Sequence, residues 1–237
     1  LTSDSKADYD SSSKSGEVIV HGVNGRLIKA QTANQRKLVD SVYKNDIVFA
    51  IGPAGTGKTY TGVALAVRAL KNKEVKRIIL TRPAVEAGEN LGFLPGDLKE
   101  KLDPYMQPLY DALRDMIPPE KLDSYIENGT IQIAPLAFMR GRTLDHAFVI
   151  LDEGQNTTHA QMKMFLTRMG KDAKFLLTGD PGQIDLPRRT ISGLKEALLI
   201  LKDIEGVGMI FLDDKDVIRH KLVKKVIEAY KHIENRD

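Results

Sequence analysis

The chain has 237 residues, of which 42% are hydrophobic and 28% are charged. At roughly 100 to 200 residues per domain, this length allows one large domain or two small ones. Cysteine is absent, which excludes disulfides, thiolate-bound metal sites and a cysteine nucleophile. No apolar run reaches a membrane-spanning length and no signal peptide is visible, so we expect a cytoplasmic protein without a membrane partner.

Positive and negative charges nearly balance, because 35 Lys and Arg face 32 Asp and Glu and leave a net charge of +3. Their distribution is uneven. Residues 83–130 hold ten acidic and four basic side chains, so this stretch carries −6 and the remainder carries +9. Two interpretations remain open: an ordinary solvated acidic surface, or a separate basic binding face on the rest of the chain.

In chain order, residues 1–16 are rich in Ser, Asp and Lys and predict a disordered tail or linker. A short strand at 18–20 and an amphipathic helix at 33–43 follow. Five short apolar runs then predict buried strands, and helical patterns separate most of them. The strands are expected at 46–51, 75–81, 147–151, 173–178 and 207–211, and the helices at 58–71, 158–169, 191–201 and 217–232. This alternation predicts a doubly wound α/β fold with a parallel sheet and helices on both faces, formed by residues 17–237.

The acidic stretch interrupts this alternation and holds six of the ten prolines. Proline removes a backbone donor and disfavours the helix interior. We therefore expect a helical insert at about 82–130 that its prolines break into short helices.

A glycine-rich motif, GPAGTGKT, joins the strand at 46–51 to the helix at 58–71. It matches G-x-x-x-x-G-K-[ST] in the required strand-to-helix context, in which backbone N–H groups and a helix N-terminus surround phosphates. Lys58 is expected to reach the β- and γ-phosphates and Thr59 to bind Mg²⁺. The alternative is a glycine-rich turn that binds nothing. The predicted nucleotide-binding residues are Gly52, Pro53, Ala54, Gly55, Thr56, Gly57, Lys58, Thr59 and Tyr60.

Two further strand ends carry polar groups. FVILDEGQNTT places Asp152 where it would hold Mg²⁺ through the water shell of the metal, and Glu153 where it would activate a water molecule. Either residue alone is also consistent with a helix cap. TGDPGQIDLP places Asp180 toward the metal and Gln183 toward the γ-phosphate, and the alternative is a simple Pro-Gly turn.

These blocks, together with TRPAVEAGENLGFLPGDLKEKLDPYMQPLYDAL, IAPLAFMRGRTLDHAFVILDEGQNTT and DVIRHKLVKKVI, resemble the PhoH-like P-loop ATPase family from about residue 32 to residue 230. The resemblance implies a single RecA-like lobe that binds ATP and Mg²⁺. It makes Lys58, Glu153 and Gln183 catalytic residues, Thr59 and Asp152 magnesium residues, Gln35 an adenine-reading residue and Arg219 an arginine finger. Read from the residues alone, Gln35 is a polar residue early in an amphipathic helix.

Three positions depart from the family pattern. Gly182 precedes Gln183 where a hydroxyl residue is frequent, Gly154 replaces an alanine and adds backbone freedom, and Lys221 follows the Arg-His pair where proline is frequent. None of these changes removes a charged participant, so we expect activity to be retained.

A single lobe needs a neighbouring copy to supply an arginine finger unless Arg219 folds back within its own chain. We therefore expect a homo-oligomeric ring, which is hexameric by analogy with related single-lobe ATPases. Arg82 lies in the segment TRPAVEAGE, which follows the strand where helicase relatives contact a nucleic-acid backbone, and Arg140 and Arg142 lie in MRGRT. All three are expected to contact the phosphates of single-stranded RNA. The alternative is that they pair with Glu86, Glu89 or the acidic insert. Tryptophan is absent and no aromatic ladder is present, which argues against sequence-specific RNA reading.

The leading functional hypothesis is Mg²⁺-dependent ATP hydrolysis coupled to RNA binding or remodelling. The alternative is an ATP-dependent switch or scaffold for a protein partner. A small-molecule kinase is disfavoured because the sequence offers no acceptor pocket.

Overall fold

The computed structural model describes residues 17–83, 98–187 and 189–218, apart from the side chains of 98–104. The predicted tail at 1–16, most of the predicted helix at 217–232 and Arg219 lie outside the described residues. Within the described part, no helix combines the length and the apolar composition that crossing a membrane requires.

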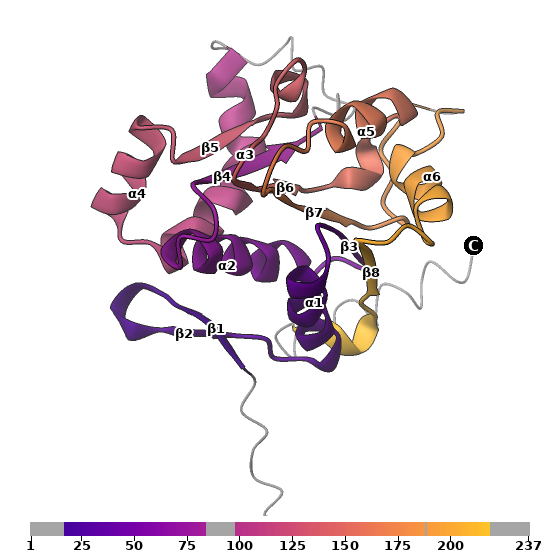
Figure 1. Cartoon of the computed structure of the whole chain (residues 1–237). Helices are drawn as coiled ribbons and strands as arrows, with labels where there is room; N and C mark the ends of the chain where they lie inside the picture. The colour runs from indigo at the N-terminus through magenta and orange to yellow at the C-terminus, as the bar shows by residue number, and fades with distance from the viewer. Residues whose placement is uncertain (1–16, 84–97, 188, 219–237) are drawn as a thin grey trace, which may run out of the picture.

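A six-stranded sheet forms the centre of the molecule, with the strand order β5-β4-β6-β7-β3-β8 (Figure 1). Every pair of neighbouring strands is parallel, so all six carboxyl ends lie at one edge. The predicted α/β class is therefore confirmed. The strands are β3 (Ile47–Ile51), β4 (Arg77–Arg82), β5 (Ile131–Pro135), β6 (Ala147–Leu151), β7 (Lys174–Gly179) and β8 (Val207–Phe211).

Helices cover both faces of the sheet because alternate strand residues are apolar on both sides. Val48 and Ala50 of β3 point into one buried cluster, and Phe49 and Ile51 point into the other. The first cluster is covered by α1 (Ala33–Lys44), α2 (Lys58–Lys71), α3 (Leu98–Met116) and α4 (Pro119–Glu127), and the second by α5 (His159–Leu166) and α6 (Gly193–Ile200). Figure 1 shows α1 and α2 below the sheet, and α5 and α6 above it.

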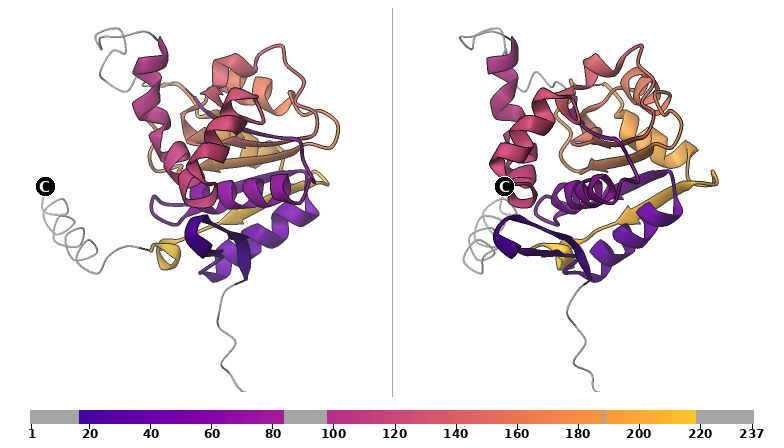
Figure 2. Two further views of the ribbon diagram at one scale, coloured as in Figure 1. Left: turned by 90° about the vertical axis from the view of Figure 1, so that its left-hand side faces the viewer. Right: turned by 60° about the vertical axis from the view of Figure 1, so that its left-hand side comes forward.

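An antiparallel hairpin precedes this layer. It consists of β1 (Val18–His21) and β2 (Leu27–Lys29), joined by the 3-10 turn η1 (Val23–Gly25). Ile19, Val20 and Ile28 are buried in the same cluster as α2, so the hairpin lies against the helices and away from the sheet (Figure 2). The sequence predicts β1 but not β2, because three residues are too few to show a strand period.

The acidic stretch differs most from its prediction. The helix α3 has 19 residues and continues through Pro104 and Pro108, so the predicted break at these prolines is wrong. The apolar face of α3 compensates for the missing backbone hydrogen bonds, because Leu109, Leu113 and Met116 are buried in the main core. Moreover, α3 and α4 lead into β5, an unpredicted strand that pairs with β4. They therefore form a crossover between two neighbouring parallel strands.

Shorter helical turns complete the described structure: η3 (Leu136–Met139), η4 (Gly154–Asn156) and η5 (Asp214–Asp216). Two helices are shorter than predicted, since α5 ends at Leu166 and α6 begins at Gly193. Both η3 and η4 follow the carboxyl ends of strands, and they lie at the same sheet edge as the glycine-rich loop.

Candidate active site

The glycine-rich loop is shaped by its backbone conformation and by its contacts with neighbouring segments. Gly57 caps α2 with φ 77°, in the left-handed region that other residues adopt only with strain. A side chain at Gly52 would collide with the carbonyl oxygen of Leu212, which arrives from β8. Thr56 is fully buried and its hydroxyl donates to the Pro53 carbonyl at 2.9 Å. The loop residues thus lie where the motif predicts them, between β3 and α2.

Gln35 anchors this loop to α1. Its side chain is 3% exposed, and its Nε2 donates to the Thr56 carbonyl at 2.9 Å. Its Oε1 accepts from the backbone N–H of Gln31 at 2.8 Å, and Gln35 closes a capping box with Thr32 at the start of α1. The structure therefore gives Gln35 a role in positioning the loop, and adenine reading stays a prediction.

Lys58 turns back onto the loop in this structure. Its Nζ donates to the carbonyls of Gly52 at 2.6 Å and Pro53 at 2.8 Å. Burial lowers the pKa of Lys58, and the carboxylates of Asp180, Glu153 and Asp152 oppose this shift. The ammonium group is therefore held in place beside the loop, with acidic groups close enough to affect its charge.

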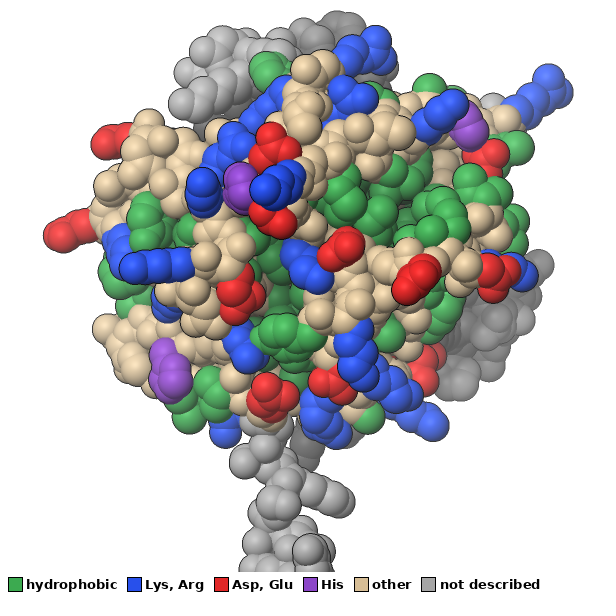
Figure 3. Space-filling model, in the orientation of Figure 1, with side chains coloured by type: hydrophobic (Ala, Val, Ile, Leu, Met, Phe, Trp, Pro, Cys, Tyr) green, Lys and Arg blue, Asp and Glu red, His purple; other side chains and the backbone are tan. Residues whose placement is uncertain are grey.

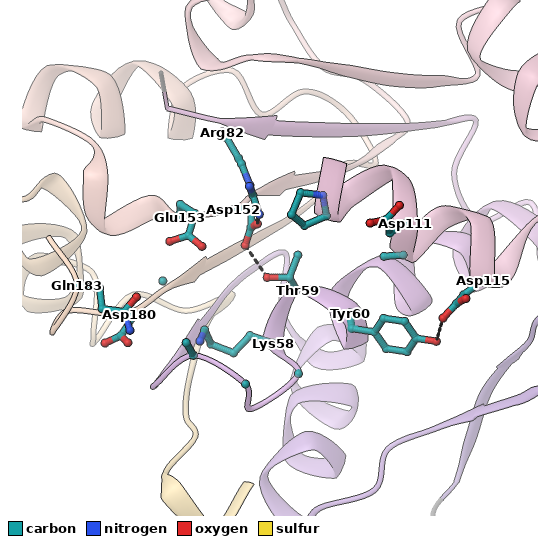
Figure 4. Close-up of a pocket in the computed structure, with 16 residues that line it drawn as sticks. Lys58, Thr59, Tyr60, Arg82, Asp111, Asp115, Asp152, Glu153, Asp180 and Gln183 are labelled. Atoms are coloured by element: carbon teal, nitrogen blue, oxygen red, sulfur yellow. Dashed lines mark hydrogen bonds and ion pairs between the residues drawn. The ribbon is translucent and has the colours of Figure 1, made fainter. Parts of the chain in front are cut away.

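Asp152 is the most buried acid of the site, at 1% exposure, and four donors surround its carboxylate, of which Figure 4 shows those of Thr59 and Arg82. The Thr59 hydroxyl donates to Oδ1 at 2.6 Å, and the Thr178 hydroxyl donates to the same oxygen. The Arg82 guanidinium donates to Oδ2 through Nε at 2.9 Å and through Nη2 at 2.6 Å. The predicted pair Thr59 and Asp152 is thus in direct contact, although 93 residues separate the two in sequence.

Arg82 lies in this site and not on the surface where an RNA backbone contact was predicted. It is 8% exposed and forms an ion pair with Asp152, whereas the alternative partners Glu86 and Glu89 lie outside the described residues. The register explains the pairing: Thr81 of β4 lies beside Leu151 of β6, so the next residue of each strand meets at the carboxyl end. Nη1 of Arg82 also donates to the Tyr105 carbonyl at 2.5 Å.

Glu153 follows Asp152 in a left-handed conformation, with φ 56°. Such a backbone costs about 1–3 kcal/mol for a non-glycine residue and is typical of functional sites. Gln155 holds the side chain, because its Nε2 donates to Glu153 Oε2 at 2.5 Å while its Oε1 accepts from the Asp180 backbone N–H at 3.1 Å. Gln155 is buried and was not predicted as a site residue, although its place two positions after Glu153 is a local signal.

The segment after β7 contains both the predicted polar groups and the alternative turn. The Gln183 backbone N–H donates to the Asp180 carbonyl at 3.0 Å, and Asp180 Oδ1 accepts from the Gly182 backbone N–H at 2.9 Å. The turn leaves the Gln183 side chain exposed at the rim of the same cavity as Lys58 and Glu153 (Figure 4).

A cavity of about 500 Å³ brings these groups together. It extends from Gln183 past Lys58 to α3, where the Tyr60 hydroxyl donates to Asp115 at 2.9 Å. Burial, together with the hydrogen bond to Asp115, raises the pKa of Tyr60 to about 12. The charged lining is mainly acidic: Lys58 and Arg82 face Asp111, Asp115, Asp152, Glu153 and Asp180.

The donor set fits a hard divalent cation. A threonine hydroxyl and a carboxylate oxygen lie 2.6 Å apart beside the loop, and Mg²⁺ prefers oxygen ligands. The described residues contain no group of three His, Cys, Asp or Glu that would hold a metal by themselves. Thr59 and Asp152 would therefore share such an ion with phosphate oxygens and water, as in phosphate-bound Mg²⁺ sites generally.

Arg140 and Arg142 lie outside the cavity, after η3. Arg140 is exposed, and Arg142 donates to Gln132 Oε1 at 2.7 Å. In the described part of the chain, neither forms an ion pair with a carboxylate, so the pairing with acidic residues that was left open is not found there.

Known proteins with similar sequences carry PhoH names. A PhoH-like protein of Bacillus subtilis (strain 168) is 61% identical over 214 residues, which cover 90% of this chain and 67% of that protein. Protein PhoH of Escherichia coli (strain K12) is 44% identical over 205 residues, which cover 86% of this chain and 58% of that protein. The chain thus spans about three fifths to two thirds of the length of these relatives.

Among solved structures, the DNA-bound DUF1998 helicase MrfA matches 86% of this chain and 28% of its own length, with 15% identity and a TM-score of 0.48.

The PhoH-like protein family model matches residues 27–231, which include the loop, both acidic strand ends and most of the predicted C-terminal helix. The chain therefore belongs to the PhoH-like protein family.

Proposed function

We propose that the chain binds ATP with Mg²⁺ and hydrolyses it in the cavity beside the glycine-rich loop. The observation that carries this proposal is the contact between Thr59 and Asp152 at the loop, with Glu153 and Lys58 lining the same cavity. A phosphate site alone would need only the loop. Hydrolysis also requires a carboxylate for the metal, which is Asp152, and a second acid to activate water, which is Glu153.

Each residue then has one task. Lys58 exchanges the loop carbonyls for the β- and γ-phosphate oxygens, which offer charge as well as hydrogen bonds. Thr59 and Asp152 hold Mg²⁺, which when bound neutralises charge on the phosphates. Glu153, held by Gln155, accepts a proton from the attacking water, and Gln183 orients that water or senses the γ-phosphate.

The acidic lining favours completion of the site by another chain. Five carboxylates face two cations among the described lining residues, and one of these cations, Arg82, is already paired with Asp152. Hydrolysis would gain from a further positive group at the γ-phosphate, which we assign to Arg219 of a neighbouring copy in a ring, hexameric by our proposal. Ile218, the last described residue, donates its N–H to the Gly55 carbonyl of its own chain at 3.1 Å, so action of Arg219 within the same chain is the alternative to the ring. A monomer in gel filtration with undiminished ATPase activity would contradict the ring.

RNA contact is supported by a shallow, open groove beside α5, which is lined by the basic residues Arg140, Lys163 and Arg168. Arg142 borders it, because its carbonyl accepts from Arg168 Nη1 at 3.3 Å. None of these four cations pairs with a carboxylate among the described residues, which leaves their charge available for phosphates. Figure 3 shows Lys and Arg side chains along the upper edge of the molecule, with Asp and Glu side chains among them.

An exposed aromatic ring accompanies the groove. Phe138 on η3 is 57% exposed, two residues before Arg140. One base of an RNA strand could stack on the Phe138 ring while the basic groove binds its phosphates. Such stacking does not depend on which base is present. Because η3 follows β5 at the carboxyl edge of the sheet, this surface and the ATP cavity lie at the same edge.

The alternative, a switch or scaffold for a protein partner, is supported by a different surface. An apolar groove of about 340 Å³ lies between α5 and α6, and Ile200, which lines it, is 64% exposed. Exposed apolar patches of this kind often mark protein contacts.

One experiment separates the two hypotheses: ATP turnover with and without single-stranded RNA, at several salt concentrations. RNA remodelling predicts stimulated turnover and RNA affinity that falls steeply with salt. Unstimulated turnover, with RNA binding near background at every salt concentration, supports the scaffold. Absence of any ATP turnover contradicts the enzymatic proposal itself.

A further inference from the structure

Arg82 is the cation that neutralises the buried Asp152 in this structure. Two of its N–H groups reach the same carboxylate oxygen, and a third reaches the Tyr105 carbonyl at 2.5 Å. The guanidinium carbon also lies 5.1 Å from the centre of the Tyr105 ring. The Arg82 side chain therefore connects Asp152, the predicted metal carboxylate after β6, to Tyr105 of α3.

Mg²⁺ and Arg82 compete for Asp152. A carboxylate offers about four lone-pair positions, and four donors already surround this one. Thr59 and Thr178 are neutral, and Thr59 is itself a proposed metal residue. Arg82 is positively charged, so a divalent cation arriving at the same carboxylate repels it. The bond that weakens first is therefore the one between Arg82 and Oδ2.

Tyr105 is suited to respond to such a change. Its hydroxyl is buried and has no hydrogen-bond partner among the described residues, which makes its present position unfavourable. The next turn of α3 is firmly packed, because Met106 and Leu109 are buried in the main core. A displacement at Tyr105 is consequently passed to a helix that also lines the cavity through Asp111 and Asp115.

We infer that Arg82 is a positioning residue that holds α3 to Asp152 while the site lacks metal and releases it when Mg²⁺ and nucleotide bind. The inference rests on the proposed function, since it needs a Mg²⁺-nucleotide site at Asp152. Arg82 thus acts inside the proposed ATPase site, and the acidic helix α3 changes position when nucleotide binds.

The first test uses a fluorescent reporter on α3. The chain has no tryptophan, so Tyr105→Trp introduces a single emitter beside Arg82. A non-hydrolysable ATP analogue with Mg²⁺ is expected to change its emission, whereas the analogue with EDTA is not. Adding Arg82→Gln should abolish the change while the analogue still binds. Arg77→Gln, at the other end of β4 and bonded to a backbone carbonyl, is the matched control and should preserve it.

The second test needs no reporter and no turnover. The Mg²⁺ concentration for half-maximal binding of a fluorescent ATP analogue is measured for the wild type, Arg82→Gln, Arg82→Lys and Arg77→Gln. Removing the competitor is expected to lower this concentration about fivefold or more in Arg82→Gln, a typical size for coupling between sites. Arg82→Lys, which keeps the charge without the fork, should lie between Arg82→Gln and the wild type.

The outcomes are distinct. An unchanged or higher Mg²⁺ requirement in Arg82→Gln overturns the inference, and so does an emission change that persists without Arg82. If Arg82→Gln fails to fold by circular dichroism, an unchanged Mg²⁺ requirement in Arg82→Lys overturns it instead. Failure of the wild type to bind the analogue at all would contradict the proposed function, and not the role of Arg82 alone.

Discussion

Gly57 allows the contact between the loop and α1 to be measured. In Gly57→Ala the backbone keeps φ 77°, which costs about 1–2 kcal/mol for a residue with a side chain. The added Cβ would also lie 2.9 Å from Gln35 Nε2, inside van der Waals contact. Gln35 is buried and held by its hydrogen bonds, so the amide moves away only by giving up its bond to Thr56.

The second effect can be estimated from that bond. An intramolecular hydrogen bond contributes about 0.5–1.5 kcal/mol, and a buried carbonyl left without a partner costs about 1–3 kcal/mol. Gly57→Ala is therefore expected to lower the free energy of unfolding by about 2–5 kcal/mol in total, summing backbone strain and the lost contact.

Gly25→Ala is the matched control, because Gly25 has φ 74° and no atom lies within 4 Å of the position of its added Cβ. Urea unfolding followed by circular dichroism should show a loss of only about 1–2 kcal/mol for this variant. The losses from Gly57→Ala and Gln35→Ala should be less than additive in the double variant, since both substitutions remove the same bond to Thr56. Equal losses for Gly57→Ala and Gly25→Ala would refute the reasoning.

Three further predictions follow from the site. Thr178→Val removes one donor to Asp152 and is expected to lower the free energy of unfolding by about 1 kcal/mol. Thr167→Val, at the exposed end of α5, is the control. An unchanged urea midpoint in Thr178→Val would contradict this prediction. Arg140→Ala and Lys163→Ala should each reduce the salt dependence of RNA binding by about one phosphate contact in a filter-binding titration, whereas an unchanged slope would place the RNA elsewhere. Burial lowers the pKa of Lys58 from its ordinary value of 10.5, so its ammonium group loses its charge at a lower pH than free lysine does. Calorimetry should therefore show that nucleotide affinity falls as the pH rises toward 10.5. Lys58→Arg should not show this fall, because arginine keeps its charge.

The sequence predicted those parts of the site that depend on local structure. The loop from Gly52 to Thr59 is one continuous segment between a strand and a helix, so its composition is sufficient to identify it. Asp152 and Gln183 follow buried strands, and parallel strands bring their carboxyl ends to one edge. The alternating faces of β3 were likewise visible as a continuous apolar run.

The parts that were missed depend on the order and register of strands. Arg82 and Thr178 reach Asp152 because β4 and β7 are the two neighbours of β6, and no local pattern gives that order. The strand β5 was missed because it contains Gln132 and ends at Pro135, which weakens its apolar run. The prolines of α3 misled the prediction because tertiary burial of Leu109 and Leu113 outweighs their local effect.

The most direct test of the account is ATP turnover by Glu153→Gln. This substitution keeps the size of the side chain, and it removes only the ability to accept a proton from water. A positioned general base typically contributes about 10²- to 10⁴-fold to the rate. We therefore expect a loss of that size in turnover with nucleotide binding retained, whereas Glu120→Gln on α4 should behave as the wild type. Unchanged turnover in Glu153→Gln would contradict the proposal that this cavity hydrolyses ATP.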